Sequence, residues 1–181
     1  MTRADRIEAE FPPGMVMPPR LRELCDHLDS HGYPISGYMK LRPEGQSLQA
    51  WFGPGTQAWN ALAGFGAGPD GSILAFWLYE GGDISRAPVV HLGSEGSAFV
   101  LADGLDEFLR LFGVGYSELG FDDLSLSPEE PESAERLRHW LQDRFGIVAP
   151  STGADIVARA QACHPGFAVW VREAQRIRDE V

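Results

Sequence analysis

Apolar positions near the start of the chain repeat with the spacing of a helix. Four of them recur at intervals of three and four residues, as on one buried helix face: Leu21, Leu24, Cys25 and Leu28. Prolines at 18 and 19 suit the first turn of a helix, and Gly32 followed by a proline suits its end. The pattern therefore predicts a helix over 18–31. The proline-rich segment 11–19 is predicted to be extended, because proline lacks a backbone donor.

Between residues 36 and 102 the spacing changes, and short apolar runs alternate with turn sequences. Six runs are predicted to be strands: 36–42, 47–52, 61–66, 73–79, 87–92 and 97–102. The first two are expected to pair as a hairpin around residues 42–46. The sequence Gly-Pro-Asp-Gly at 68–71 is the clearest turn. The run 73–79 is apolar on both alternating faces, which is typical of a central strand covered on both sides.

Helical spacing returns after the last predicted strand. Asp103 is predicted to cap a helix that ends at Gly113 or Gly115. Four apolar side chains form the stripe of this helix: Leu105, Phe108, Leu109 and Phe112. Three further helices are expected: about 127–145, 154–163 and 166–179.

The grouping of these elements indicates the fold class. Strands that lie together between helices favour an α+β fold over an alternating α/β fold. We expect a mostly antiparallel or mixed sheet of about five to six strands, flanked by helices, with a C-terminal helical extension. Residues 1–120 would form the main domain, and 121–181 would form an acidic loop and a helical extension packed on the same domain.

Acidic residues outnumber basic ones, 26 to 15, which gives a formal net charge of −11. Such a surface repels phosphate backbones and anionic lipid, so neither a nucleic acid nor a membrane is expected as a partner. A cationic protein would instead be attracted and would associate faster. The alternative is that the acidity serves solubility alone.

Two features predict a cytoplasmic location. Residues 1–10 hold no apolar segment of the kind found in signal peptides, and no apolar run approaches the roughly 20 residues that span a bilayer. Cys25 and Cys163 both lie in apolar helical patterns, and we interpret them as small buried hydrophobic residues in a reducing compartment.

No motif for catalysis, metal binding or a cofactor stands out. His27 and His31 have the i, i+4 spacing of a zinc pair, but the glutamate of a zinc protease motif is missing between them, so two surface histidines are favoured. The glycine-rich segment 64–68 lacks the Gly-Lys-Ser/Thr ending of a phosphate loop and is interpreted as a hairpin turn. His91 is expected to be a hydrogen-bonded strand histidine. We therefore expect no catalytic residue, no metal and no cofactor.

Tryptophans and acids are the candidates for contact with a partner. Three tryptophans are expected in the core: Trp77, Trp140 and Trp170. Trp51 and Trp59 flank a Gly/Pro loop, where they either pack in the core or serve as exposed anchors for a partner. Segment 121–135 carries six acids and no base: Asp122, Asp123, Glu129, Glu130, Glu132 and Glu135. Adjacent acids in a loop indicate solvated charge and not a general acid/base pair.

The segment from Pro88 to Gly113 resembles the C-terminal signature of the SUKH superfamily, which includes the yeast Smi/Knr-type cell-wall regulators and many bacterial immunity proteins. The family pattern is a strand with Pro-Val, here at 88–89, a turn, and a strand that ends in alanine, here Ala102. A helix of the form Leu-x-x-Phe-Leu follows, here at 105–109. The proline-preceded helix at 18–24 is similar to the family's first helix, and the resemblance covers about residues 15–115.

This resemblance implies a protein-binding immunity protein without catalytic residues, which neutralises a cognate toxin by direct contact. A basic toxin, such as a nuclease, would suit the acidic chain. Eight residues form the candidate interface: Trp51, Trp59, Glu80, Asp83, Asp122, Asp123, Glu129 and Glu130. Two alternatives stay open. One is an enzyme or small-molecule sensor with a pocket near Trp51, Trp59 and His91, and the other is a regulatory scaffold protein.

Overall fold

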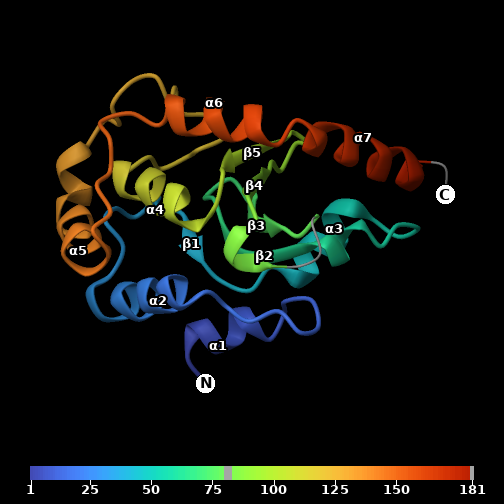
Figure 1. The fold of residues 1–181 in the computed structure, drawn as a ribbon, viewed down its shortest axis with the longest axis horizontal. Coiled ribbons are helices and arrows are strands. Elements are labelled where there is room, and N and C mark those ends of the chain that lie inside the picture. Colours follow the sequence, from blue (N-terminus) through green and yellow to red (C-terminus); the bar gives the residue numbers. More distant parts are fainter. Residues whose placement is uncertain (80–82, 180–181) are drawn as a thin grey trace.

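An antiparallel sheet of five strands lies at the centre of the structure, a computed structural model that describes residues 1–79 and 83–179 (Figure 1). The strands lie in chain order from one edge to the other: β1 Lys40–Leu41, β2 Leu62–Ala67, β3 Ile73–Trp77, β4 Val89–Leu92 and β5 Ala98–Ala102. The predicted turn at 68–71 joins β2 to β3, and Gly71 adopts the positive φ of 85° that such a turn favours. The predicted α+β class and antiparallel sheet are confirmed.

Helices surround this sheet in the part of the chain that the structure describes. The α-helices are α1 Arg3–Glu8, α2 Pro19–His31, α3 Gly45–Phe52, α4 Leu105–Val114, α5 Glu135–Phe145, α6 Ala154–Cys163 and α7 Gly166–Asp179. The 3-10 helices are η1 Ala58–Ala61, η2 Ile84–Arg86 and η3 Pro131–Ala134. In Figure 1, α1 and α2 lie below the sheet, α6 and α7 lie above it, and α5 lies at the left-hand end. None of the helices within 1–79 and 83–179 has the length and apolar character needed to cross a bilayer.

The sheet separates two buried apolar clusters, and β3 contributes to both. Leu74 and Phe76 belong to the larger cluster, together with apolar residues of α1, α2 and α4. Ile73 and Trp77 point the other way, into a smaller cluster with residues of α3 and α7. Every residue of β3 is buried, so the predicted two-sided burial of this strand is confirmed.

The segment that carries the family resemblance folds as predicted, as two paired strands braced by a helix. β4 and β5 pair antiparallel, and α4 packs against β5. Phe108 of α4 is fully buried, and its ring centroid lies 5.3 Å from that of Phe65 on β2. Gly115 ends α4 in the left-handed conformation, which confirms one of the two predicted helix ends.

The hairpin predicted for 36–42 and 47–52 is wrong. Residues 45–52 form helix α3, and only Lys40–Leu41 of the first segment is a strand, paired with the end of β2. Leu48 and Phe52 are four residues apart, so a helix turns both toward the sheet, where both are buried in the smaller cluster. A short apolar run does not by itself distinguish a helix from a strand, and burial against β2 favours the helix here.

Two boundaries also need correction. Residues 64–67 lie within β2, so the turn predicted at 64–68 begins only at Gly68. The helix predicted over about 127–145 begins with η3 at Pro131, and α5 continues from it. The physical reason is that a residue before a proline, here Glu130, is disfavoured in the helical conformation.

Two side-chain predictions are wrong as well. Cys163 is exposed, whereas Cys25 is buried as predicted. Asp103 is not the cap of α4, because the cap position is occupied by Gly104, which has no side chain.

Close contact between α3 and β2 depends on the missing side chain at Gly64. A Cβ atom there would lie 2.9 Å from Cβ of Glu44 and from Cδ1 of Leu48. We expect Gly64→Ala to lower the free energy of unfolding by about 1–3 kcal/mol, because the helix and the strand must move apart. Gly37→Ala, where a Cβ atom meets nothing within 4 Å, should change it by less than about 0.5 kcal/mol. Urea unfolding measures both values, and equal stabilities would contradict the close contact.

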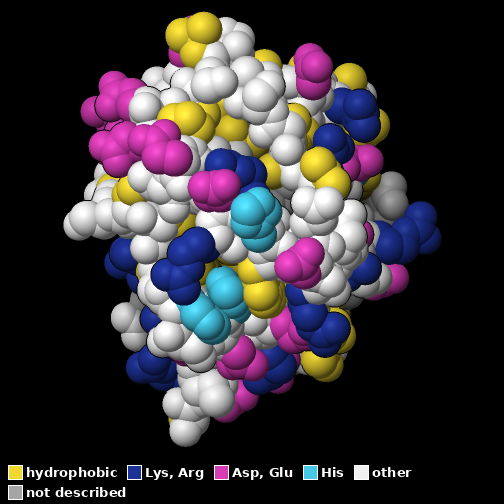
Figure 2. Space-filling view, turned by 90° about the vertical axis from the view of Figure 1, so that its left-hand side faces the viewer, with side chains coloured by type: hydrophobic (Ala, Val, Ile, Leu, Met, Phe, Trp, Pro, Cys, Tyr) yellow, Lys and Arg dark blue, Asp and Glu magenta, His cyan; other side chains and the backbone are white. Residues whose placement is uncertain are grey.

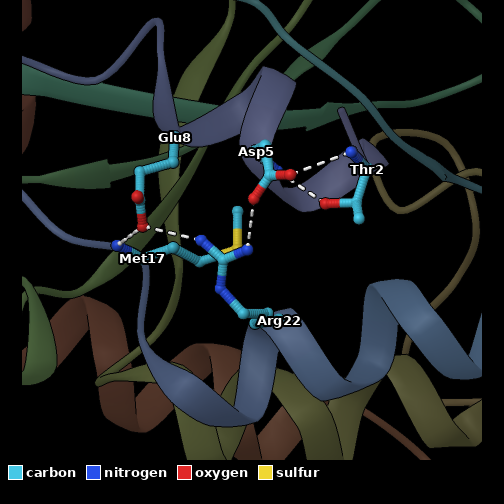
Figure 3. Close-up of polar contacts among 5 residues, drawn as sticks. All are labelled: Thr2, Asp5, Glu8, Met17 and Arg22. Atoms are coloured by element: carbon cyan, nitrogen blue, oxygen red, sulfur yellow. Dashed lines mark hydrogen bonds and ion pairs between the residues drawn. The ribbon is translucent and has the colours of Figure 1, made fainter.

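Helix α1, which the apolar pattern did not predict, is joined to α2 in part by the guanidinium of Arg22. Thr2 and Asp5 form a capping box at the start of α1. Arg22 of α2 lies between two carboxylates: its Nη1 is 2.7 Å from Asp5 Oδ1 and its Nη2 is 3.0 Å from Glu8 Oε2 (Figure 3). Glu8 also accepts a hydrogen bond of 2.7 Å from the backbone N–H of Met17, just before α2. The N-terminal segment is thus joined to α2 by polar contacts at both ends.

These contacts predict the titration of Asp5. The backbone N–H of Thr2, and then Arg22, lower the pKa of Asp5 to about 2. At pH values above the usual aspartate pKa, the charged carboxylate of Asp5 therefore stabilises the folded state. This stabilisation is lost as the pH falls toward 2. We expect Arg22→Met to raise the pKa of Asp5 only part of the way to its usual value, since Thr2 stays in place. NMR titration of the carboxyl carbons measures this, and Asp83, whose pKa is lowered by Ser85, serves as an unchanged internal control.

Candidate functional site

Four acids of the predicted interface lie around one hollow of about 670 Å³. Five acids line this acidic hollow: Glu118, Asp122, Asp123, Glu129 and Glu130. Ile35, just after α2, and Leu126 add apolar surface to it. Figure 2 shows the molecule from the side of α5, with acidic side chains gathered near the top of this face and histidines at its centre. The structure thus brings together residues that the sequence places in two separate pairs.

Tyr116 holds the segment that forms the acidic hollow. Its hydroxyl is buried and lies 3.0 Å from the carbonyl oxygen of Leu124 and 2.7 Å from that of Leu126, either of which can accept its proton. The same oxygen accepts a hydrogen bond of 3.0 Å from the backbone N–H of Gly153, just before α6. Burial raises the pKa of Tyr116, so the phenol keeps its proton at neutral pH. The segment is therefore attached to the start of α6 and not free in solvent.

Hydrogen bonds orient the carboxylates of Asp122 and Asp123 in the acidic hollow. Asp122 Oδ2 accepts a bond of 2.9 Å from the backbone N–H of Glu118. Asp123 Oδ1 accepts bonds of 2.6 Å from the hydroxyl and 3.0 Å from the backbone N–H of Ser125, and these bonds lower the pKa of Asp123. The bonds from Ser125 thus favour the charged form of Asp123. The hollow therefore presents oriented negative charge.

Exposed apolar side chains flank this charge. Phe121 is 63% exposed and Leu126 is 61% exposed, although both belong to large apolar residue types. Both lie in the same segment as the five acids, and Leu126 lines the hollow itself. A surface that combines exposed apolar groups with one sign of charge is typical of a site for another protein.

The other candidate residues lie elsewhere. Trp51 and Trp59 are half-buried against the smaller cluster, and the indole N–H of Trp51 donates a bond of 2.9 Å to the carbonyl of Gly93. Trp59 lines a second hollow, of about 540 Å³, beside α3. Asp83 accepts bonds from Ser85 at the start of η2, and Glu80 lies outside the described residues. The structure therefore does not join Trp51, Trp59 or Asp83 to the acidic hollow.

His91 does not share a face of the sheet with Trp51 and Trp59, so the three residues do not line one pocket together. His91 alternates along β4 with Val90 and Leu92 of the smaller cluster, so its ring points to the opposite face of the sheet from both tryptophans. The expectation that His91 is hydrogen-bonded is also wrong at one atom. The side chain is buried, and its Nδ1 has no hydrogen-bond partner within 1–79 and 83–179.

One polar cluster was not predicted from the sequence. The hydroxyl of Tyr79 lies 2.9 Å from Nδ1 of His164, and Nε2 of His164 lies 2.5 Å from Oδ1 of Asp103. A hydroxyl, an imidazole and a carboxylate in this order also occur in hydrolases, where the hydroxyl belongs to a serine. Here the three side chains come from distant segments of the chain, so no local spacing in the sequence reveals the cluster. We infer that this cluster holds the junction of α6 and α7 against the sheet.

His27 and His31 form a stack and do not converge on a metal. Their ring centroids lie 4.4 Å apart, and the ring of Trp140 lies 4.1 Å from that of His27 on the other side. Across 1–79 and 83–179, no cluster of three or more potential metal ligands occurs. The stack therefore serves contact between α2 and α5.

Comparisons with protein-family models, with curated proteins and with solved structures found no match to the chain. The resemblance to the SUKH superfamily therefore stays a prediction from the sequence, chiefly from the residues of Pro88–Gly113.

Proposed function

We propose that this protein is a binding module of the immunity class, which neutralises a cognate basic toxin by direct contact at the acidic hollow. The observation that carries the proposal is the convergence of five acids on one hollow with exposed apolar groups beside them. A toxin that acts on nucleic acid needs a basic surface, and an acidic protein can occupy that surface in place of phosphates. The site of action would be the cytoplasm.

The acids of the hollow and the exposed apolar side chains beside them would act at different stages of binding. The net charge of −11 and the oriented carboxylates attract a cationic surface from a distance and speed up encounter. Phe121 and Leu126 would then lose contact with water against the toxin, which slows dissociation. Charge without such apolar contact would give a fast but short-lived complex.

Co-expression with the toxin encoded beside this chain's own gene tests the proposal. We expect cells that produce the toxic domain to survive only when this chain is present, and the two purified proteins to form a stoichiometric complex. A variant with Asp122, Asp123, Glu129 and Glu130 all changed to lysine serves as the matched control, with its fold checked by circular dichroism. Equal protection by this folded variant would remove the acidic hollow from the proposal, and no binding by the unchanged chain would overturn it.

A further inference from the structure

His91 lies beneath the loop that forms one wall of the acidic hollow. The side chain is only 2% exposed, and the ring contacts Phe99 on β5 with a centroid distance of 4.9 Å. Gly120 covers it from the loop side. A Cβ atom on Gly120 would lie 2.9 Å from Cε1 and 3.1 Å from Nε2 of His91, so the loop backbone rests directly on the edge of the imidazole.

A second proton on the buried ring would lack an acceptor. A protonated imidazole needs an acceptor at both nitrogens, and Nδ1 of His91 has none among the residues that the structure describes. The neighbours across the sheet are Leu74 on β3 and Phe99 on β5, neither of which accepts a hydrogen bond through its side chain. A charge formed here would be buried among apolar groups, which costs free energy unless water reaches it.

One charged group opposes this effect. Asp70, in the turn between β2 and β3, acts on His91 and favours its protonated form, but Asp70 is engaged with the hydroxyl of Ser72 at 2.6 Å. Burial acts in the other direction and outweighs Asp70, so the pKa of His91 is lowered. The loop itself carries Glu118 and Asp122, two residues to either side of Gly120, but both line the acidic hollow on the outer side of the turn. The neutral ring is therefore the form that the closed loop accommodates.

Hydrogen bonds within the loop over His91 hold it together as one turn. The carbonyl of Glu118 accepts hydrogen bonds from the backbone N–H groups of Phe121, at 3.0 Å, and Asp122, at 2.8 Å. The side chain of Asp122 accepts from the backbone N–H of Glu118. Residues 118–122 thus form a compact turn. Its inner residues are Gly120, against His91, and Leu119, which is buried in the larger cluster, and its outer residues Glu118 and Asp122 line the acidic hollow.

We propose that His91 is a proton-operated latch, whose protonation lifts the 118–122 turn and takes the wall of the acidic hollow apart. Lifting the turn would let water reach the ring and satisfy both nitrogens. The closed hollow is then fully favoured above the ordinary histidine pKa of about 6.5, and it is lost progressively as the pH falls below that value. The inference does not depend on a toxin partner, because it concerns the loop alone.

Hydrogen exchange of residues 117–124 at pH 7.5 and pH 5.5 tests the latch on the protein alone, after correction for the intrinsic pH dependence of exchange. We expect the opening equilibrium of this segment to rise by up to about tenfold between the two values, since one proton per opening is taken up below about pH 6.5. His91→Phe keeps a ring of similar size that does not titrate, so this rise should be abolished. His139→Phe, at an exposed histidine on α5, should behave as the unchanged protein.

A second measurement covers the case in which His91→Phe does not fold. NMR titration of the imidazole carbons in the unchanged protein should show His91 protonating in step with shifts of the 117–124 amides. The proposal is overturned if His91 titrates without any change in those amides, or if exchange at 117–124 is independent of pH. It is also overturned if folded His91→Phe retains the rise. Loss of toxin binding would not by itself affect any of these results.

Discussion

Phe108→Ala is expected to lower the free energy of unfolding by about 3–5 kcal/mol, the range for removing a large buried aromatic side chain. Phe108 is fully buried in α4 and contacts the rings of Phe65 on β2 and Phe112 one turn along the helix. Truncation leaves a cavity between α4 and the sheet, where the surrounding strands relax only in part. The loss would weaken the brace on which the β4–β5 hairpin rests.

Phe121→Ala provides the matched control, because the same atoms are removed from a side chain that is 63% exposed. Little apolar burial is lost there, so the change should stay below about 0.5 kcal/mol. Guanidinium unfolding followed by circular dichroism measures both variants. A cost below about 1 kcal/mol for Phe108→Ala would contradict the packing of α4 on the sheet.

Long, regular patterns allowed the sequence to predict most of the fold. The helices at 154–163 and 166–179 are found within the same bounds, and the strand at 73–77 lies within its predicted range. The two helices have apolar positions at helical spacing, and the strand is one continuous apolar run between two turn sequences. The short run at 47–52 failed because it has only a few apolar positions, which fit either period. This run packs as a helix because Gly64, in another part of the chain, leaves room for it against β2.

The acidic hollow could be predicted only in part. Acid content identified four of its five carboxylates, but their convergence depends on Tyr116, which bonds to Gly153 from 37 residues away. Nothing near Asp122 in the sequence indicates this bond. The state of His91 was hidden for a similar reason, since its cover, Gly120, lies 29 residues further along the chain. Tertiary contacts of this kind leave no trace in local spacing.

Reversing charge in the acidic hollow is expected to slow association with a basic toxin by at least about tenfold at low salt. Asp122→Lys combined with Glu130→Lys places two positive charges where the hollow presents oriented carboxylates. The dissociation rate should change less, because Phe121 and Leu126 keep their apolar contacts. Stopped-flow association at several salt concentrations measures the effect, which should shrink as salt screens the charges.

Glu95→Lys combined with Glu173→Lys is the control with the same change in net charge. Both residues are exposed, and the turn that holds Glu95 lies against α7, which carries Glu173, as the bond from Gln175 to the carbonyl of Gly96 shows. Figure 1 places α7 at the opposite end of the molecule from α5. If net charge alone steers the toxin, both double variants slow association equally, and the acidic hollow has no special role. If the hollow is the interface, the first variant slows association far more, because the local field at the point of contact dominates the final approach.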